Sequence, residues 1–252
     1  MIYKLIKCIQ YFNYLIFKIK FDKKISSKKI KWTFKRNSVV KNFDQHILKS
    51  VPHYIESQSL VVSLSNFFLK DGGTFYDLGC STGALIEKVK NSNKEVKAKY
   101  IGLDNSKEMI SFAKKKKLKD CNFFKKDIVK VNFTNADMIV SMFTMQFILP
   151  KHRQKIYDKI YKSLNWGGSF ILFEKIRGND ARFQDIFNFL YFDFKKKNKL
   201  DSVEILDKEK SLRGVLEPYT IQANIDFLKR AGFKDITPIT QYLNFIGFLA
   251  IK

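Results

Sequence analysis

Cysteine and histidine are scarce in this sequence. Its 252 residues contain three cysteines, Cys8, Cys80 and Cys121, and three histidines. No two cysteines form a C-x-x-C pair and none lies in a cluster with histidine, which excludes a disulfide framework and a zinc-binding pattern. We therefore expect a protein of the reducing cytoplasm that holds no metal ion.

Arginine is rare as well, since only six of the 47 basic residues are arginine and the others are lysine. A formal net charge of +23 suits a surface for nucleic acid or acidic membranes, because counter-ion release favours basic proteins on phosphate backbones. Here, however, the lysines are spread along the chain among many asparagine, isoleucine and phenylalanine residues. We interpret them as a bias of the source genome and expect no direct nucleic-acid binding.

Long apolar runs are also missing. Residues 1–20 place apolar and basic side chains at helical spacing, which predicts a basic amphipathic helix. Lys4, Lys7, Lys18 and Lys20 leave only about ten uninterrupted residues, whereas a membrane span needs about 20. No small-residue cleavage site follows, so we expect no signal peptide.

Two interpretations of residues 1–20 stay open. One is contact with an anionic membrane surface or a partner, and the other, which we favour, is an appendage of the following domain. The lysine-rich residues 20–38 predict a linker. We therefore expect an extension over 1–38 and one principal domain over 39–252, since a hydrophobic content of 45% supports a core of this size.

Strand-like and helical patterns alternate along the principal domain. Two helical segments are expected between Asn42 and Lys70, with a break at Val51–Pro52. Further helices are expected at 83–91, 106–117, 150–164 and 220–230, and strands at 74–78, 98–103, 121–126, 136–142, 169–175, 235–242 and 244–251. This alternation predicts an α/β fold with a doubly wound, mostly parallel seven-stranded sheet.

Two features interrupt the simple alternation. Residues 179–216 predict a helical insertion with an aromatic stripe that we interpret as packing: Phe183, Phe187, Leu190, Tyr191 and Phe194. The last two strands follow each other closely, which predicts an antiparallel hairpin with its turn at Leu243–Asn244. A parallel sheet with this ending resembles the Rossmann-like class I methyltransferases that use S-adenosylmethionine, whereas dehydrogenases end on a parallel strand.

The segment Thr74–Gly83 joins an apolar strand to Asp77 and then to a turn with glycines at both ends. Gly79 and Gly83 let the backbone turn tightly and approach a ligand, and a helical pattern follows. This arrangement predicts a loop that binds a nucleotide-type cofactor. A nicotinamide enzyme is an alternative, but its loop would carry a third glycine where Ser81 or Thr82 stands.

The same loop also matches the G-x-S-x-G pattern of a hydrolase nucleophile elbow, with Ser81 as nucleophile. That chemistry needs a histidine base after the last strand, in the chain order serine, acid, histidine. His46 and His53 precede the serine, and His152 begins a helix between basic neighbours. The histidine positions therefore favour the cofactor loop over the hydrolase.

Carboxylates follow the other strands at the edge where ligands bind in a doubly wound sheet. Asp104 and Asn105 come after the second strand, about 20 residues beyond the glycine loop, where a carboxylate can accept both hydrogen bonds of a ribose diol. Asp127 and Ile128 follow the third strand and suit the amine and the ring of adenine. Met142 ends the fourth strand.

Several strings resemble one family, the bacterial carboxy-S-adenosylmethionine synthases, over about residues 40–252. They are Phe43-Asp-Gln-His-Ile47, Ser50-Val-Pro-His-Tyr54, Tyr76-Asp-Leu-Gly-Cys-Ser81, Leu103-Asp-Asn-Ser106, Phe143-Thr-Met-Gln-Phe147, Asp193-Phe-Lys195 and Ala231-Gly-Phe233. The resemblance implies a homodimeric transferase that moves the carboxyl group of prephenate onto S-adenosylmethionine. A second enzyme then uses this carboxylated derivative to modify the tRNA wobble uridine.

The resemblance also implies roles for individual residues. Its cofactor positions fall on Tyr54, the Gly79-Cys80-Ser81 loop, Asp104-Asn105 and Asp127-Ile128. Met142 stands where the family has asparagine.

The family arginine that binds the transferred carboxylate falls on Glu209, and Lys208, Lys210 or Arg213 is the nearest substitute. No side chain in the sequence stands out as a catalytic base. The alternatives are an ordinary small-molecule methyltransferase and a non-catalytic protein that binds S-adenosylmethionine.

Overall fold

The structure of the protein is a computed structural model that describes residues 37–252, with side chains from Phe43 onward. The amphipathic helix predicted for 1–20 and most of the predicted linker lie outside the described residues. Helices are α2 (Asn37–Ser50), α3 (Tyr54–Phe68), α4 (Ala84–Ser92), α5 (Lys107–Lys115), α6 (Pro150–Ser163), α7 (Ala181–Lys197), α8 (Ser202–Ser211) and α9 (Ile221–Ala231), with a 3-10 turn η1 (Met145–Phe147). Strands are β1 (Thr74–Leu78), β2 (Lys99–Asp104), β3 (Cys121–Lys125), β4 (Ala136–Met142), β5 (Leu164–Lys175), β6 (Asp235–Tyr242) and β7 (Phe245–Ile251).

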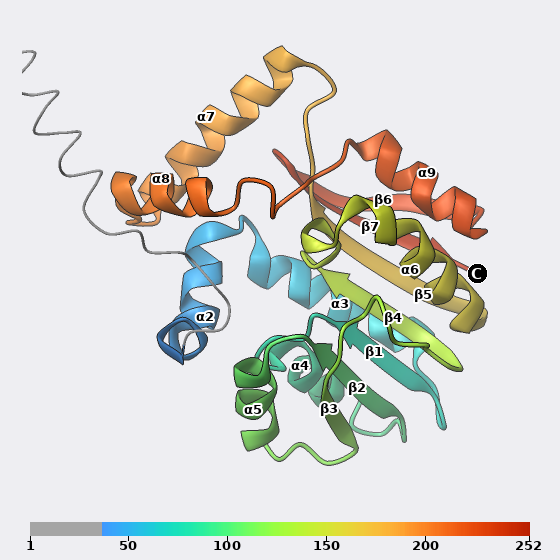
Figure 1. Cartoon of the computed structure of the whole chain (residues 1–252). Coiled ribbons are helices and arrows are strands. Elements are labelled where there is room, and N and C mark those ends of the chain that lie inside the picture. The colour runs from blue at the N-terminus through green and yellow to red at the C-terminus, as the bar shows by residue number, and fades with distance from the viewer. Residues whose placement is uncertain (1–36) are drawn as a thin grey trace, which may run out of the picture.

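The strands form one seven-stranded sheet in the order β3-β2-β1-β4-β5-β7-β6 (Figure 1). β1 pairs in parallel with both β2 and β4. The strand order therefore runs outward from β1 in one direction through β2 and β3, and in the other direction from β4 onward. β7 is antiparallel to β5 and to β6. The predicted doubly wound sheet with a C-terminal hairpin is confirmed.

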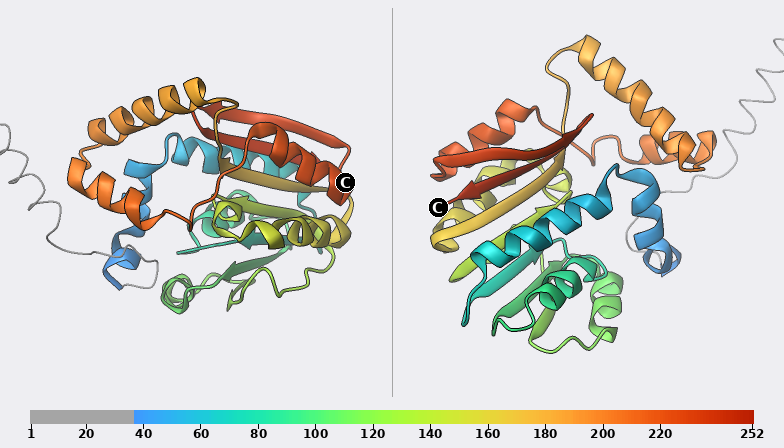
Figure 2. Two further views of the ribbon diagram at one scale, coloured as in Figure 1. Left: turned by 45° about the horizontal axis from the view of Figure 1, so that its top comes forward. Right: turned by 180° about the vertical axis from the view of Figure 1, so that it is seen from behind.

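Helices cover both faces of the sheet, as Figure 2 shows. α3, α4 and α5 pack on one face, and α6 and α9 pack against each other on the opposite face. β4 supplies both cores in alternation, because Met138 and Val140 join the first and Ile139 the second. Burial on both sides explains why this strand is an almost continuous apolar run.

Most element bounds lie within one or two residues of the prediction, but β5 begins earlier than expected. Helix α6 ends at Ser163 because Leu164 is already extended and pairs with Ala136. The pairing then shifts register and resumes at Ser169 opposite Met138, so Trp166 projects outward with 88% of its surface exposed. This irregular start hid the first residues of the strand from a pattern based on alternation.

The predicted insertion contains α7 and α8, which lie beside α2 on the side of the molecule away from α9 (Figures 1 and 2). Its aromatic stripe has two different environments. Tyr191 and Phe194 stack with ring centroids 6.5 Å apart, and Tyr191 also contacts Phe245 of β7 at 5.1 Å. Phe183 and Leu190 are exposed, so the prediction of packing holds for only part of the stripe.

Candidate cofactor and substrate site

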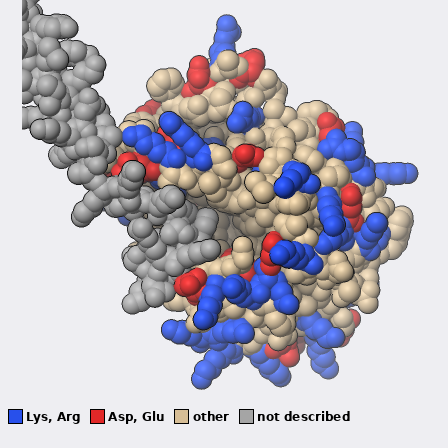
Figure 3. Space-filling view, in the orientation of Figure 1, with Lys and Arg blue, Asp and Glu red and all other residues tan. Residues whose placement is uncertain are grey.

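A cavity of about 1140 Å³ lies beyond the carboxyl ends of β1 to β5. The loops after these strands form one side of it, and side chains of α2, α3, α7 and α8 form the other. It opens at the hollowed centre of the face shown in Figure 3. The cavity therefore occupies the topological switch point, where open α/β sheets bind their ligands.

The loop after β1 is held in a tight turn. Gly79 has a φ of 82°, and an added Cβ there would lie 2.1 Å from Thr144 Oγ1, so only glycine fits. The amides of Gly79 and Cys80 both donate to Leu103 O, at 2.7 and 3.0 Å. The loop is thereby fixed against the end of β2.

Asp104 is the carboxylate that this arrangement orients. Its Oδ2 accepts the Ser81 amide at 3.0 Å and its Oδ1 accepts the Ser106 amide at 2.8 Å. A carboxylate has about four acceptor positions, so each oxygen keeps one for a ligand. Burial raises the pKa of Asp104, and the backbone donors oppose that rise. The residue fits a ribose diol, which would donate two hydrogen bonds to it.

The predicted adenine position has a similar construction. Asp127 lines the cavity and accepts the Val129 amide at 3.0 Å through Oδ1, which leaves Oδ2 for a ligand amine. Ile128 is only 5% exposed and belongs to the core on the α6 side of the sheet. A flat apolar ring beside Ile128 with its amine toward Asp127 is compatible with this geometry.

The loop does not have the features of a nucleophile elbow. The Ser81 hydroxyl donates to Gly79 O at 3.4 Å, and His46 Nε2 lies instead near Ser50 Oγ at 3.2 Å. Burial raises the pKa of the Cys80 thiol, which keeps it protonated. Burial and the neighbouring Asp104 also raise the pKa of Asp77 to about 8, so at neutral pH Asp77 is largely a hydrogen-bond donor.

The cavity brings together most of the residues singled out from the sequence. Those that line it are Tyr54, Asp77, Gly79, Cys80, Ser81, Asp104, Asn105, Asp127, Ile128, Met142, Glu209 and Arg213, together with Lys208. Gly83 and Lys210 are not among its lining residues. Gly83 serves packing, because an added Cβ would lie 2.8 Å from the Phe123 ring.

A basic end of the cavity is lined by Lys175 of β5, Lys195 of α7 and Lys208 of α8. Sequence reasoning named Lys208 as a substitute for the family arginine but missed Lys175 and Lys195 as candidate binding residues. Lys208 Nζ lies 2.6 Å from His46 Nε2 and 3.2 Å from Ser50 Oγ. Nothing in the sequence separates Lys175 from the many surface lysines. For Lys195 the only signal was the family resemblance of the string around it.

The described residues lack two other kinds of feature. Within residues 37–252, no helix is both long and apolar enough to cross a membrane. In the same range, no group of three or more His, Cys, Asp and Glu side chains could hold a metal ion. Cys80 and Cys121 are free thiols.

Comparison with known proteins agrees with this geometry at the level of the fold. A methyltransferase domain model matches residues 75–168. The structure of human N-acetylserotonin methyltransferase in complex with S-adenosylmethionine is similar, with a TM-score of 0.60 and 19% sequence identity. The matched region covers 87% of this chain and 57% of the human chain. The fold and site define a class I S-adenosylmethionine-dependent transferase.

Two curated relatives narrow the class. Carboxy-S-adenosyl-L-methionine synthase of Staphylococcus epidermidis is 40% identical over 222 residues, which are 88% of this chain and 97% of the relative. The enzyme of the same name from Nautilia profundicola is 35% identical over 92% of this chain and 100% of its own. The chain therefore belongs to the carboxy-S-adenosyl-L-methionine synthase family. This membership confirms the predicted resemblance and the predicted S-adenosylmethionine cofactor.

Proposed function

We propose that the protein transfers the carboxyl group of prephenate to the methyl carbon of S-adenosylmethionine. The methyl carbon loses a proton and gains the carboxyl carbon, while prephenate loses carbon dioxide and its ring hydroxide and becomes phenylpyruvate. Proton and hydroxide leave as water, so atoms and charge balance. The observation that supports this most is the cavity itself, which has the strand-end carboxylates on one side and lysines at its other end. The relatives that share this fold are named carboxy-S-adenosyl-L-methionine synthases.

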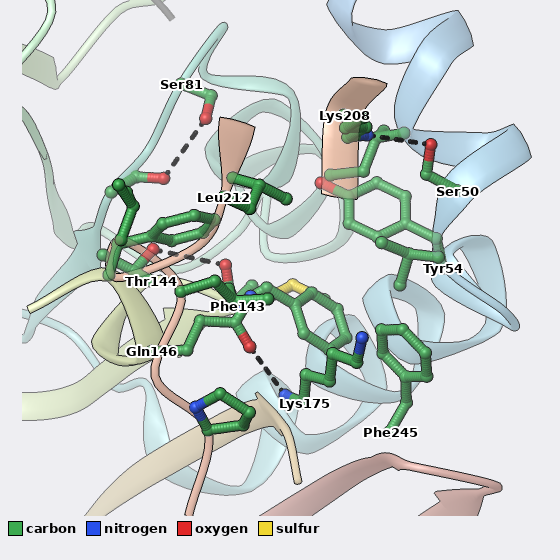
Figure 4. A pocket seen from close by; sticks show the side chains of 18 of the residues that line it. Ser50, Tyr54, Ser81, Phe143, Thr144, Gln146, Lys175, Lys208, Leu212 and Phe245 are labelled. Carbon is green, nitrogen blue, oxygen red and sulfur yellow. Dashed lines mark hydrogen bonds between the residues drawn. The ribbon is translucent and has the colours of Figure 1, made fainter. Parts of the chain in front are cut away.

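The cofactor roles follow from the donors and acceptors of the cavity. Asp104 would hold the ribose, Asp127 and Ile128 the adenine, and the Gly79–Ser81 backbone the methionine part. Tyr54 would close the site from α3, where its ring lies 6.3 Å from that of Phe143 (Figure 4). Gln58 donates to the Tyr54 hydroxyl at 3.3 Å and fixes its orientation.

Mass spectrometry tests the proposal directly. Purified protein is incubated with S-adenosylmethionine with and without prephenate, and we expect the carboxylated cofactor only when prephenate is present. The ligand that co-purifies with the protein is identified in parallel. Failure to form or to bind the carboxylated cofactor, with S-adenosylmethionine still bound, would contradict the proposal.

The second candidate is an ordinary methyltransferase that acts on a small molecule. Two observations favour it: Glu209 places a carboxylate at the edge of the cavity where the family has arginine, and Met142 lines the cavity in place of asparagine. This candidate predicts S-adenosylhomocysteine as the co-purifying nucleoside. A non-catalytic binding protein would hold unchanged S-adenosylmethionine.

The proposal also covers the location of the enzyme, the use of its product and its oligomeric state. The domain over 39–252 would act in the cytoplasm, and its product would supply a second enzyme that modifies the tRNA wobble uridine. The exposed apolar side of α7, which includes Phe183, Ile186 and Phe189, would be covered in a homodimer. Residues 1–38 would form an N-terminal extension and linker.

A further inference from the structure

Two lysines from distant parts of the chain meet at the basic end of the cavity. Lys175 ends β5 and Lys195 lies near the end of α7, and both line the cavity. The Lys175 Nζ lies 4.6 Å and the Lys195 Nζ 4.2 Å from the ring centroid of Tyr191. In Figure 4 the Lys175 side chain points into the cavity beside Phe245. Both ammonium groups therefore lie against the same aromatic ring, and the charge of Lys195 acts on Lys175.

Within residues 43–252, neither ammonium group has a hydrogen bond or an ion pair within 4 Å. Lys195 is only 9% exposed, so water does not compensate it fully. Glu209 is the acidic group whose field reaches both lysines and Tyr191, but it is exposed and forms no ion pair with them. A buried charge without a partner is costly, and a second like charge adds to that cost.

The titration of these groups agrees with this geometry. Burial, and after it the charge of Lys195, lowers the pKa of Lys175 to about 8, while Glu209 opposes the shift. Burial also lowers the pKa of Lys195. Lys208 adds a third positive charge that interacts with both, and its own pKa falls to about 8. An anion bound at these lysines would offset the repulsion and raise their pKa values toward the ordinary lysine range.

We infer that Lys175 and Lys195 form a carboxylate-binding subsite, which uses the ammonium groups of two cavity-lining lysines where an arginine fork could have served. The inference rests on the proposed function, because it assumes a carboxylate at this end of the cavity. That carboxylate belongs either to the acid that donates the carboxyl group or to the carboxylated cofactor. Both sources need the same recognition, namely two positive charges in an aromatic, poorly hydrated setting.

A purely structural role for the two lysines makes a different prediction. Their methylene stems cover the Tyr191 ring, so removal of a stem would disturb α7 and weaken every ligand alike. Lys→Met variants separate the two explanations, because methionine keeps an unbranched apolar stem and loses only the charge. Lys→Arg variants keep the charge and should restore binding.

The experiment compares Lys175→Met and Lys195→Met with wild type in the full-length protein. Calorimetry measures the Kd of S-adenosylmethionine and of the carboxylated cofactor, and steady-state assays measure the KM for prephenate. Lys196→Met is the matched control, since Lys196 is the exposed neighbour of Lys195 on α7 and does not line the cavity. S-adenosylmethionine binding also reports whether each variant is folded.

We expect each neutral variant to bind S-adenosylmethionine within about threefold of wild type and to lose about tenfold or more in carboxylate recognition. A weaker Kd for the carboxylated cofactor assigns the subsite to that molecule, whereas a higher KM for prephenate alone assigns it to the donor acid. Lys195→Arg should recover most of the loss, and Lys196→Met should change neither quantity.

Two results would overturn the inference. One is unchanged binding of both carboxylates in the neutral variants. The other is a parallel loss of S-adenosylmethionine, which would mean that the lysines hold the fold or the carboxylate of the methionine part. The proposed function fails separately, if wild type makes no carboxylated cofactor from prephenate. The subsite would still stand in that case if added carboxylated cofactor binds in a lysine-dependent way.

Discussion

Asp104 shows how one side chain can serve the fold and a ligand together. Its two oxygens fix the turn through the Ser81 and Ser106 amides, and each oxygen retains an acceptor position. Asp104→Ala removes both sets of interactions, whereas Asp104→Asn keeps the shape and loses the charge. We expect the alanine variant to weaken S-adenosylmethionine binding roughly 100-fold, since hydrogen bonds to charged groups contribute about 1.5–3 kcal/mol each.

Calorimetric titration measures this loss, and Asp235→Ala is the control because Asp235 is an exposed aspartate at the start of β6, outside the cavity. An affinity of Asp104→Ala equal to that of wild type would show that the ribose binds elsewhere.

The negative charge of Glu209 should weaken the binding of an anion in the cavity. It lies on the exposed side of α8, lines the cavity and interacts with Lys175 and Lys195 through space. Glu209→Gln removes a charge that competes with a bound carboxylate, so we expect the carboxylated cofactor to bind about fivefold more tightly, which corresponds to about 1 kcal/mol. Glu209→Arg should give a larger gain, because arginine binds carboxylates through two parallel hydrogen bonds.

The same titrations test Glu209. Asp207→Asn is the control, because it also removes a negative charge from α8 and Asp207 does not line the cavity. Weaker binding in Glu209→Gln would mean that Glu209 orders the lysines and does not oppose the ligand.

The lysine pKa values predict how carboxylate binding depends on pH. Lys175 and Lys208 have a pKa of about 8, below the ordinary lysine value, so both are charged below pH 8 and lose their protons above it. A carboxylate binds the charged forms, and affinity should therefore be full below about pH 7 and fall as pH rises through 8. Lys195, Tyr191 and Glu209 face the same space and set the size of the effect.

Calorimetry between pH 6.5 and 9.5, in buffers of different ionisation enthalpy, would detect the proton uptake that accompanies binding above pH 8. Lys175→Met should flatten the profile, and S-adenosylmethionine serves as the comparison ligand. A profile independent of pH for the carboxylated cofactor would show that neutral lysines are not its partners.

Whole elements were easier to predict than the contacts between them. The alternating pattern predicted both ends of β1 and of β4 correctly, because both strands are short, apolar and bounded by clear turns. The start of β5 was missed because a register shift separates Leu164 from Ser169. The strand-end carboxylates Asp104 and Asp127 followed from topology alone, since parallel strands bring their carboxyl ends to one edge. The pairing of Lys175 with Lys195 could not be predicted in this way, because only the packing of α7 brings these two residues to the same ring.

Helix α6 depends on a buried arginine that orders the loop after β4. Arg153 is 1% exposed, its Nε donates to Ile148 O at 2.7 Å, and its NH2 group donates to Gln146 O at 3.1 Å. Its guanidinium lies 4.8 Å from the Tyr219 ring centroid. Burial raises the pKa of the Glu174 carboxyl to about 8, and the charge of Arg153 opposes that rise. We expect Arg153→Met to reduce the free energy of unfolding by roughly 3 kcal/mol, because it leaves two carbonyls without their charged donor.

Urea denaturation followed by circular dichroism measures this change. Lys151→Met is the control on the same helix, since Lys151 is exposed. A loss below 1 kcal/mol for Arg153→Met would show that other groups or water compensate the loop carbonyls.

At the scale of the whole molecule, charge and apolar surface are distributed differently. Figure 3 shows lysine and arginine side chains around much of the visible rim, with acidic side chains between them, which is the pattern of a solubilising surface. The exposed apolar side chains gather instead on α7, where Phe183, Ile186, Phe189, Leu190 and Phe192 are each at least 39% exposed. A patch on one helix that projects beside the cavity is more consistent with a contact surface than with chance exposure.

A single charge on α7 tests the proposed homodimer. Phe189 is 72% exposed, so Phe189→Asp should leave the fold intact, but at an apolar interface it would bury an unpaired carboxylate. We expect wild type to be a dimer in size-exclusion chromatography with light scattering, and the variant to be a monomer at micromolar concentration. Phe67→Asp is the matched control, because Phe67 on α3 is 82% exposed and lies outside the α7 surface. A monomeric wild type, or a variant that dimerises as tightly as wild type, would exclude α7 as the dimer interface.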